Sequence, residues 1–160
     1  MSHTAFDPRS DIIATIGFTR YVDGVDRSTV SVENKYGDKV FIPLLLPGEA
    51  RTGDLPRLPM IEVNLMSSPH STINIGGDVK YQEAYIDFNI YYTHTSDIEP
   101  ATFGVSVADE LCNLITSKRN NLPIGMYMEV INSGREIIEQ QDGKQVVFHR
   151  VVEVKCVNIE

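Results

Sequence analysis

Cysteine is scarce in this chain, with only Cys112 and Cys156 among 160 residues. Two cysteines cannot build a disulfide framework, and neither lies in a C-x-x-C motif of the kind that binds zinc or supports redox chemistry. Apolar runs are also short, because none approaches the ~18 consecutive residues of a membrane-spanning helix. The segment MSHTAFDPRSD at the start has no apolar core of a signal peptide. We therefore expect a reducing, cytoplasmic setting away from membranes.

Basic residues are outnumbered, since 14 lysines and arginines face 22 aspartates and glutamates, for a formal net charge of −8. A domain that reads DNA sequence needs a basic face to neutralise phosphates, so this balance argues against such a role. Hydrophobic residues make up 42% of the chain and charged residues 22%, which is a globular composition. A chain of this length can bury a core without disulfides, so we expect one domain over residues 1–160.

Motifs of catalysis and metal binding are missing as well. No two of the four histidines have the spacing of a helical metal-binding pair: His3, His70, His94 and His149. Serine and histidine are close together in 67–71, but no nucleophile-elbow pattern surrounds them and turn-forming composition accounts for the segment. His149 is expected on the outer face of a strand, solvated or hydrogen-bonded. We predict no catalytic residue, no cofactor and no metal ion.

The first third of the chain predicts a flexible arm, a helix and a hairpin. Residues 1–6 form the arm, and Asp7 with Pro8 suits the start of a helix over 8–21 that ends by Gly24. Residues 23–57 then form an insertion of a hairpin and a polar loop. Alternation predicts strands at 29–33 and 40–42. Pro43 places the second of them at a sheet edge, or at the point where the strand leaves the sheet.

After residue 57, the spacing of apolar residues has the period of a strand in some segments and the period of a helix in one. Strict alternation predicts strands at 60–66 and 81–92, joined by a long projecting loop at 67–79. Helical spacing from Val107 to Ile115 predicts a helix over 100–120. Further strands are predicted at 126–131, 135–141 and 144–158, the last two joined by a turn at Asp142-Gly143. Cys156 continues an apolar strand face and needs no reactive role.

These elements predict an α+β fold with a mostly antiparallel sheet, a short N-terminal helix and one long helix packed on one face. The apolar stripes of strands and helix must cover one another, which predicts a shared core: Ile61, Val63, Ile86, Phe88, Ile90, Leu111, Leu114 and Val152.

Two apolar segments exceed what one small domain covers easily. Leu44, Leu45 and Leu46 cannot all face inward on a strand. The loop 67–79 carries Ile73 and Ile75, and loops longer than about 12 residues are usually functional or mobile. These five residues are our candidates for a subunit interface, although a simple fold-back within the chain explains them equally well.

The order of elements resembles the tail-terminator and head–tail joining (neck) proteins of tailed viruses. The segments that carry the resemblance are LPMIEV at 58–63 and YIDFNI at 85–90 in the central strands, the helix at 107–115, and FHRVVEV at 148–154. The resemblance covers residues 58–159 and a helix near the start. The insertion at 23–57 departs from the compact members of that family, which puts the subtype in doubt: terminator, neck completion protein or baseplate relative.

The resemblance implies a structural role without catalysis. Its members assemble as a ring, here expected to be a hexamer, which terminates the tail tube and joins the tail to the head. The implied partners are further copies of the chain, the tail-tube protein and the neck or connector proteins. DNA passes through the lumen without sequence-specific binding, which an acidic surface favours. The implied location is the virion tail or neck, reached from the host cytoplasm.

The alternative from another class is a small cytoplasmic α+β hydrolase or ligand-binding domain. Such a protein needs convergent polar groups in a pocket.

Overall fold

The computed structural model of the chain describes residues 6–22, 24–50, 58–68, 81–141 and 145–159. Its elements follow one another in this order: α1 (Arg9–Ile16), β1 (Phe18–Val22), β2 (Val25–Glu33), β3 (Lys39–Leu45), α2 (Pro47–Ala50), β4 (Met60–Ser67), β5 (Tyr81–Thr93), α3 (Pro100–Lys118), β6 (Met126–Gln141) and β7 (Gln145–Ile159).

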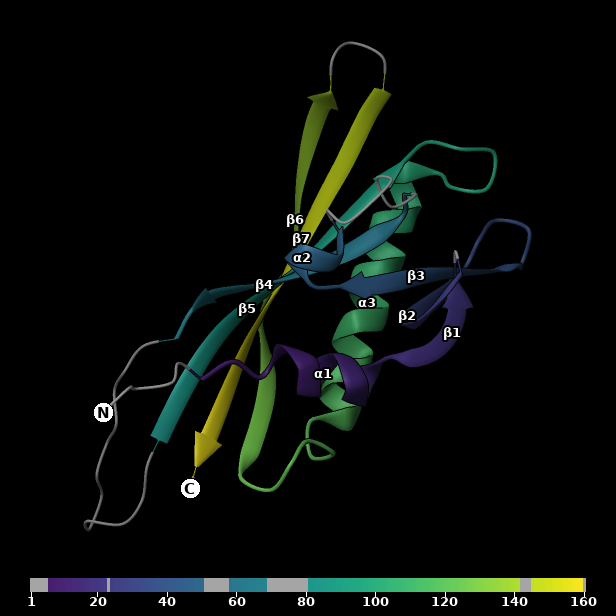
Figure 1. The fold of residues 1–160 in the computed structure, drawn as a ribbon. Coiled ribbons are helices and arrows are strands. Elements are labelled where there is room, and N and C mark those ends of the chain that lie inside the picture. The colour runs from purple at the N-terminus through teal and green to yellow at the C-terminus, as the bar shows by residue number, and fades with distance from the viewer. Residues whose placement is uncertain (1–5, 23, 51–57, 69–80, 142–144, 160) are drawn as a thin grey trace.

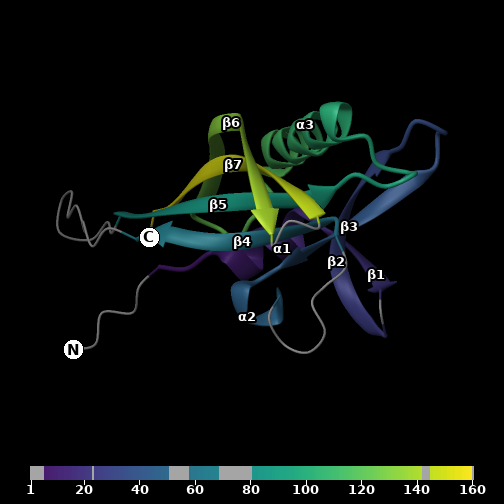
Figure 2. The ribbon, with the colours of Figure 1, turned by 90° about the horizontal axis from the view of Figure 1, so that it is seen from above.

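The strands form one sheet in the order β1-β2-β3-β4-β5-β7-β6. All neighbours are antiparallel except β3 and β4, which pair in parallel over a short stretch. Strands β1 to β3 lie at one end of the molecule, and the long strands β5, β7 and β6 lie toward the other (Figures 1 and 2). The predicted α+β fold with a mostly antiparallel sheet is therefore confirmed.

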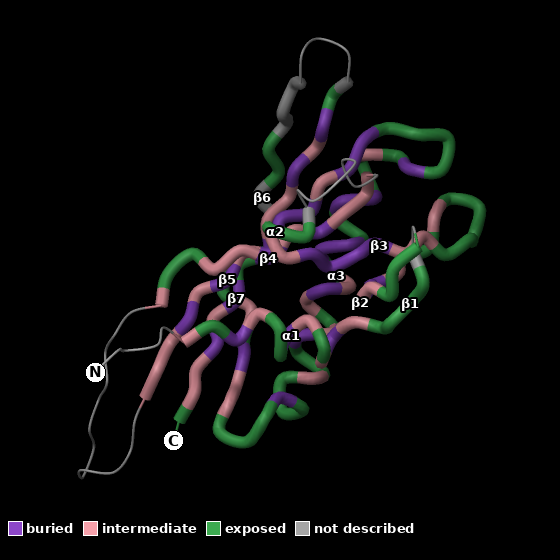
Figure 3. Tube along the Cα trace, viewed as in Figure 1, coloured by how far each residue is buried: buried purple, intermediate pink, exposed green. Residues whose placement is uncertain are grey.

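One buried cluster joins the two longer helices to the sheet. Alternate residues of β5 and β7 meet α3 and α1 in this cluster, because successive side chains of a strand point to opposite faces. Of the predicted core residues, all are buried in the cluster except Leu114, which packs against it partly exposed. Figure 3 shows the buried positions running along the central strands and α3. The sheet face opposite α1 and α3 is called the outer face below.

The predicted helix over 8–21 is wrong in its second half, because α1 ends at Ile16 and a strand begins at Phe18. Gly17 has extended backbone, and a Cβ there would lie 2.7 Å from the Ser28 Cβ. Only glycine permits this close approach of the chain to β2. Gly24, with a φ of 85°, lies just after β1 and just before β2.

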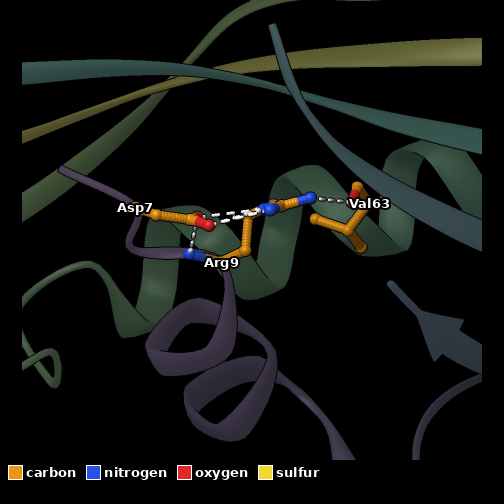
Figure 4. Close-up of polar contacts among 3 residues, drawn as sticks. All are labelled: Asp7, Arg9 and Val63. Carbon is orange, nitrogen blue, oxygen red and sulfur yellow. Dashed lines mark hydrogen bonds and ion pairs between the residues drawn. The ribbon is translucent and has the colours of Figure 1, made fainter. Parts of the chain in front are cut away.

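A short polar chain ties the start of α1 to the sheet (Figure 4). The guanidinium of Arg9 donates to both carboxylate oxygens of Asp7, at 2.8 and 2.9 Å, and to the carbonyl oxygen of Val63 in β4 at 3.4 Å. The hydrogen bonds from Arg9 hold the pKa of Asp7 below its usual value. Asp7 does not cap the helix as its position before Pro8 suggested, because Pro8 is the N-cap of α1 and no side chain caps the helix; the Asp7 carboxylate instead accepts the backbone N–H of Arg9.

Strand β3 is not an edge strand, which corrects the prediction made from Pro43. Pro43 lies where β3 exchanges partners, since it pairs with Thr29 of β2 while the next residue, Leu44, pairs with Ile61 of β4. A residue without an N–H is tolerated at such a transition. The polar loop predicted at the end of the insertion 23–57 begins with the helical turn α2, and residues 51–57 lie outside the described residues.

The two strands predicted at 126–131 and 135–141 are one continuous strand, β6. Its register against β7 shifts between Val130 and Asn132 and again between Ser133 and Arg135. Each shift inserts one extra residue, and the second is Gly134, whose φ of 103° favours glycine. These bulges break the alternation and give the sequence the appearance of two strands. The predicted turn at Asp142-Gly143 lies outside the described residues.

Replacing Leu111 by alanine tests the shared core. Leu111 is fully buried in α3, so Leu111→Ala should lower the free energy of unfolding by about 2–5 kcal/mol in a denaturant titration. Asn113→Ala, at an exposed position of the same helix, should change it by less than about 0.5 kcal/mol. Equal effects of the two variants would show that this helix face is not the core.

Gly104 provides a second packing test. A Cβ at Gly104 would overlap the ring of Tyr92, which is fixed between Phe103 and Phe148 at centroid distances of 5.4 and 5.6 Å. Helix propensity alone favours alanine over glycine by about 1 kcal/mol. We nevertheless expect Gly104→Ala to destabilise the fold by about 1–3 kcal/mol through overpacking. A stabilised variant in thermal unfolding would contradict this packing.

Candidate functional site

The outer face carries the polar side chains of the central strands. In β5 these are Asp87, Asn89 and Tyr91, which alternate with core residues. Opposite them in β7 lie Glu153, Val151 and His149, in that order. The face therefore presents a row of charged and polar groups along the longest pairing of the sheet.

His149 is buried at 8% exposure, although it lies on the predicted outer face. Its Nε2 lies 2.7 Å from the Oδ1 of Asn89, and its ring stacks on Tyr91 at a centroid distance of 4.4 Å. The Nδ2 of Asn89 donates to the carbonyl oxygen of Glu62 at 3.5 Å, which leaves Oδ1 to accept from His149. Of the two alternatives predicted for His149, the hydrogen-bonded side chain is therefore confirmed and the solvated one is wrong.

Asp87 and Glu153 form a like-charge pair, directly opposite each other on β5 and β7. No side chain of the described residues donates a hydrogen bond or contributes an ion pair to either carboxylate. Burial raises the pKa of Asp87, the charge of Glu153 raises it further, and His149 opposes both effects. Like charges directly opposite on a sheet are destabilising, so this pair is a cost to the fold.

Two rows further along the same face of β5, a carboxylate with several partners offers a contrast. Glu83 accepts hydrogen bonds from the hydroxyls of Tyr81 and Tyr85, at 2.8 and 3.1 Å, and Lys155 lies 3.4 Å away. The hydrogen bond from Tyr81 is the main reason that the pKa of Glu83 is lowered. Among the described residues, the fold thus satisfies one acidic group of this face and leaves Asp87 and Glu153 without an ion pair or a hydrogen bond from a side chain.

A shallow hollow of about 210 Å³ lies over the acidic pair. Its walls include Met66 of β4, Tyr85 of β5 and Ile131 of β6. Met66 and Ile131 are the extra residues of two register irregularities, and they are 60% and 49% exposed. A β-bulge commonly changes the direction in which a side chain points. Here the two irregularities place two large apolar side chains around two carboxylates, an arrangement that the sequence analysis did not predict.

The predicted interface residues lie in three different settings. Leu44 and Leu45 are buried within the chain, at 3% and 1% exposure, so their assignment to a subunit interface is corrected. Leu44 pairs with Ile61 in the core and Leu45 with Glu62 on the other face, because both faces of β3 are covered there. Leu46 is half-buried. Ile73 and Ile75 lie outside the described residues.

Reactive and metal-binding groups are sparse in the described part of the chain. Burial raises the pKa of the Cys156 thiol to about 12, with the charge of Asp11 adding to the effect, so this thiol is a poor nucleophile. Across the described ranges, no three histidine, cysteine, aspartate or glutamate side chains gather closely enough to hold a metal ion. None of the described helices is both long and apolar enough to cross a lipid bilayer.

Neutralising Asp87 tests the cost of the like-charge pair. Asp87→Asn should raise the free energy of unfolding at pH 7 by about 0.2–1 kcal/mol. Because the folded-state pKa of Asp87 is raised, the wild-type penalty is present at neutral pH and is relieved as the pH falls through that pKa. The difference between wild type and variant should therefore shrink in acid.

The matched control is Asp109→Asn, which removes the same charge from an exposed position of α3. This control should change stability little at either pH. Destabilisation by Asp87→Asn at pH 7 would show that Asp87 has a favourable partner in the folded state.

Comparison with models of known protein families finds none that matches this chain, and no curated protein matches its sequence. Neither comparison assigns the chain to a family.

Proposed function

We propose that the chain is a structural virion protein that forms a ring at the head-proximal end of a viral tail. The observation that carries this proposal is the pair of open sheet edges at opposite ends of one sheet, each with large exposed apolar side chains. Edge β1 exposes Phe18 and Tyr21, at 59% and 75%, and edge β6 exposes Ile131 and Ile137. Exposed edges and apolar patches are contact surfaces for further protein.

Two different surfaces at opposite ends of a subunit favour a head-to-tail contact. Such a contact closes into a ring when its rotation divides a full turn. The resemblance described above supplies the setting, in which a ring, proposed here to be a hexamer, terminates the tail tube. Its proposed partners are copies of the chain, the tail-tube protein and the neck proteins. The net charge of −8 favours a lumen along which DNA slides without binding.

The hydrolase or ligand-binding alternative finds less support. A hollow of about 390 Å³ lies between α1, β2 and the end of β3, and contains Arg27 and Glu49 with a separation of 3.8 Å. Ligand sites usually combine apolar walls with several convergent polar groups. The described residues that line this hollow include no histidine or cysteine, so they offer no base–nucleophile pair of the usual kind.

Locating the protein in assembled particles tests the proposal. Cryo-electron microscopy of the virus that carries this gene should show a ring of copies on the tail axis between tail tube and head. A copy present singly, a copy off the tail axis, or a particle without the protein would overturn the proposal. A monomer in dilute solution is compatible with it, because the tail tube can act as the template for the ring.

A further inference from the structure

Two separate parts of the sheet carry like-charge pairs of opposite sign. Asp87 lies directly opposite Glu153 between β5 and β7, and Arg20 lies directly opposite Arg27 between β1 and β2. Each pair opposes like charges on neighbouring strands, which destabilises a sheet. A sequence that places two such pairs in one sheet violates a local rule of folding, and violations of this kind concentrate at functional positions.

Each pair is accompanied by two large exposed apolar side chains. Met66 and Ile131 line the hollow over the carboxylates. Phe18 shares the face of Arg20 in β1 and Val25 shares the face of Arg27 in β2, at 59% and 50% exposure. The hollow over Asp87 and Glu153 is called the acidic hollow. The face of the β1–β2 hairpin that carries Arg20 and Arg27 is called the basic hairpin, and Asp26 lies on the other face. The two surfaces are thus alike in apolar character and opposite in charge.

We propose that the acidic hollow is the docking site for the basic hairpin of a second copy of this chain. The contact sets the arginines of one copy against the carboxylates of the next, with Phe18 and Val25 against Met66 and Ile131. It specifies how the copies join in the ring and to that extent rests on the proposed function. Charge-assisted pairs of this type are stronger than neutral ones.

Contacts within one copy compensate these charges only in part. Arg27 has a long ion pair with the exposed carboxylate of Glu49 at 3.8 Å, and the Arg20 guanidinium lies 3.7 Å from the centre of the Phe41 ring. Near the carboxylates, the interaction with His149 lowers the pKa of Asp87, but the larger effects of burial and of Glu153 raise it. An aromatic ring does not remove the charge of an arginine, so Arg20 can still pair with a carboxylate of another copy.

Charge also selects the direction of the contact. Two acidic hollows repel each other, and so do two basic hairpins, so symmetrical contacts through either surface are disfavoured. Only a hollow against a hairpin is attractive. That contact is heterologous, which is the kind that closes a ring or grows a filament.

Charge exchange between two variants tests the contact. One variant reverses the hollow (Asp87→Lys with Glu153→Lys) and the other reverses the hairpin (Arg20→Glu with Arg27→Glu). Each alone carries one sign on both surfaces and should remain monomeric. Mixed in equal amounts they should associate, because every hollow again faces a hairpin of opposite charge. Sedimentation velocity in low salt, with concentrated protein, measures both states, and circular dichroism verifies that each variant is folded.

Variants that neutralise the carboxylates without reversing their charge measure how much the acidic pair contributes to self-association. Asp87→Asn with Glu153→Gln should weaken wild-type self-association at least about tenfold, the result of losing about one charged pair, while the fold becomes more stable. The control Asp109→Asn with Glu110→Gln removes the same charge from α3 and should change association less than about twofold. If Arg27→Glu unfolds the hairpin, Arg20→Glu alone replaces the double change.

Several results would overturn the contact. These are a wild-type chain that stays monomeric at the highest concentration, folded charge-exchanged variants that fail to associate on mixing, or equal weakening by the control. Calcium binding by the wild type that is lost in Asp87→Asn with Glu153→Gln, without self-association, would instead make the hollow a cation site. If particles contain the ring but the two charge-reversed variants do not associate on mixing, this contact is refuted and the proposed function stands. If the mixed variants associate but virus particles contain no copies of the protein, the proposed function is refuted and the contact stands.

Discussion

The pairing of β5 with β7 is the constraint on which the rest of the structure depends. The two strands stay in antiparallel register over the whole of β5. Because side chains alternate between faces, this register decides which residues enter the core with α1 and α3 and which remain on the outer face. A slip of β7 by one residue would turn Glu153 into the core and Val152 out of it. The cost of burying an unpaired carboxylate excludes that arrangement.

The same register creates the feature that folding alone does not explain. It sets Asp87 against Glu153 without an ion pair among the described residues, two rows from Glu83, which has two tyrosine hydroxyls and Lys155 as partners. The fold therefore contains the means to satisfy a carboxylate on this face and does not apply them to the neighbouring pair. Strands β4 and β6 each insert one residue beside that pair and expose an apolar side chain there. A contact with another protein surface accounts for all three observations.

Sequence patterns predict the regular parts of this fold because they depend on local periodicity. Strand β5 and helix α3 each repeat one period throughout, and β4 does so up to its bulge at Met66; all three were predicted within a few residues. The segment after Gly17 was wrongly assigned to a helix, since its strand depends on pairing with β2 rather than on local preference. The acidic hollow could not be predicted, because alternation places Asp87 outward but the residue opposite it and the bulges depend on partner strands.

The most direct measurement is a double-mutant cycle on the like-charge pair, with the free energy of unfolding measured at pH 7. The account predicts that Asp87→Asn and Glu153→Gln each stabilise the fold. Together they should stabilise it by less than the sum, because either change alone already removes the repulsion. Strict additivity, or a loss of stability in the single variants, would contradict it, since the two carboxylates would then not oppose each other at a cost to folding.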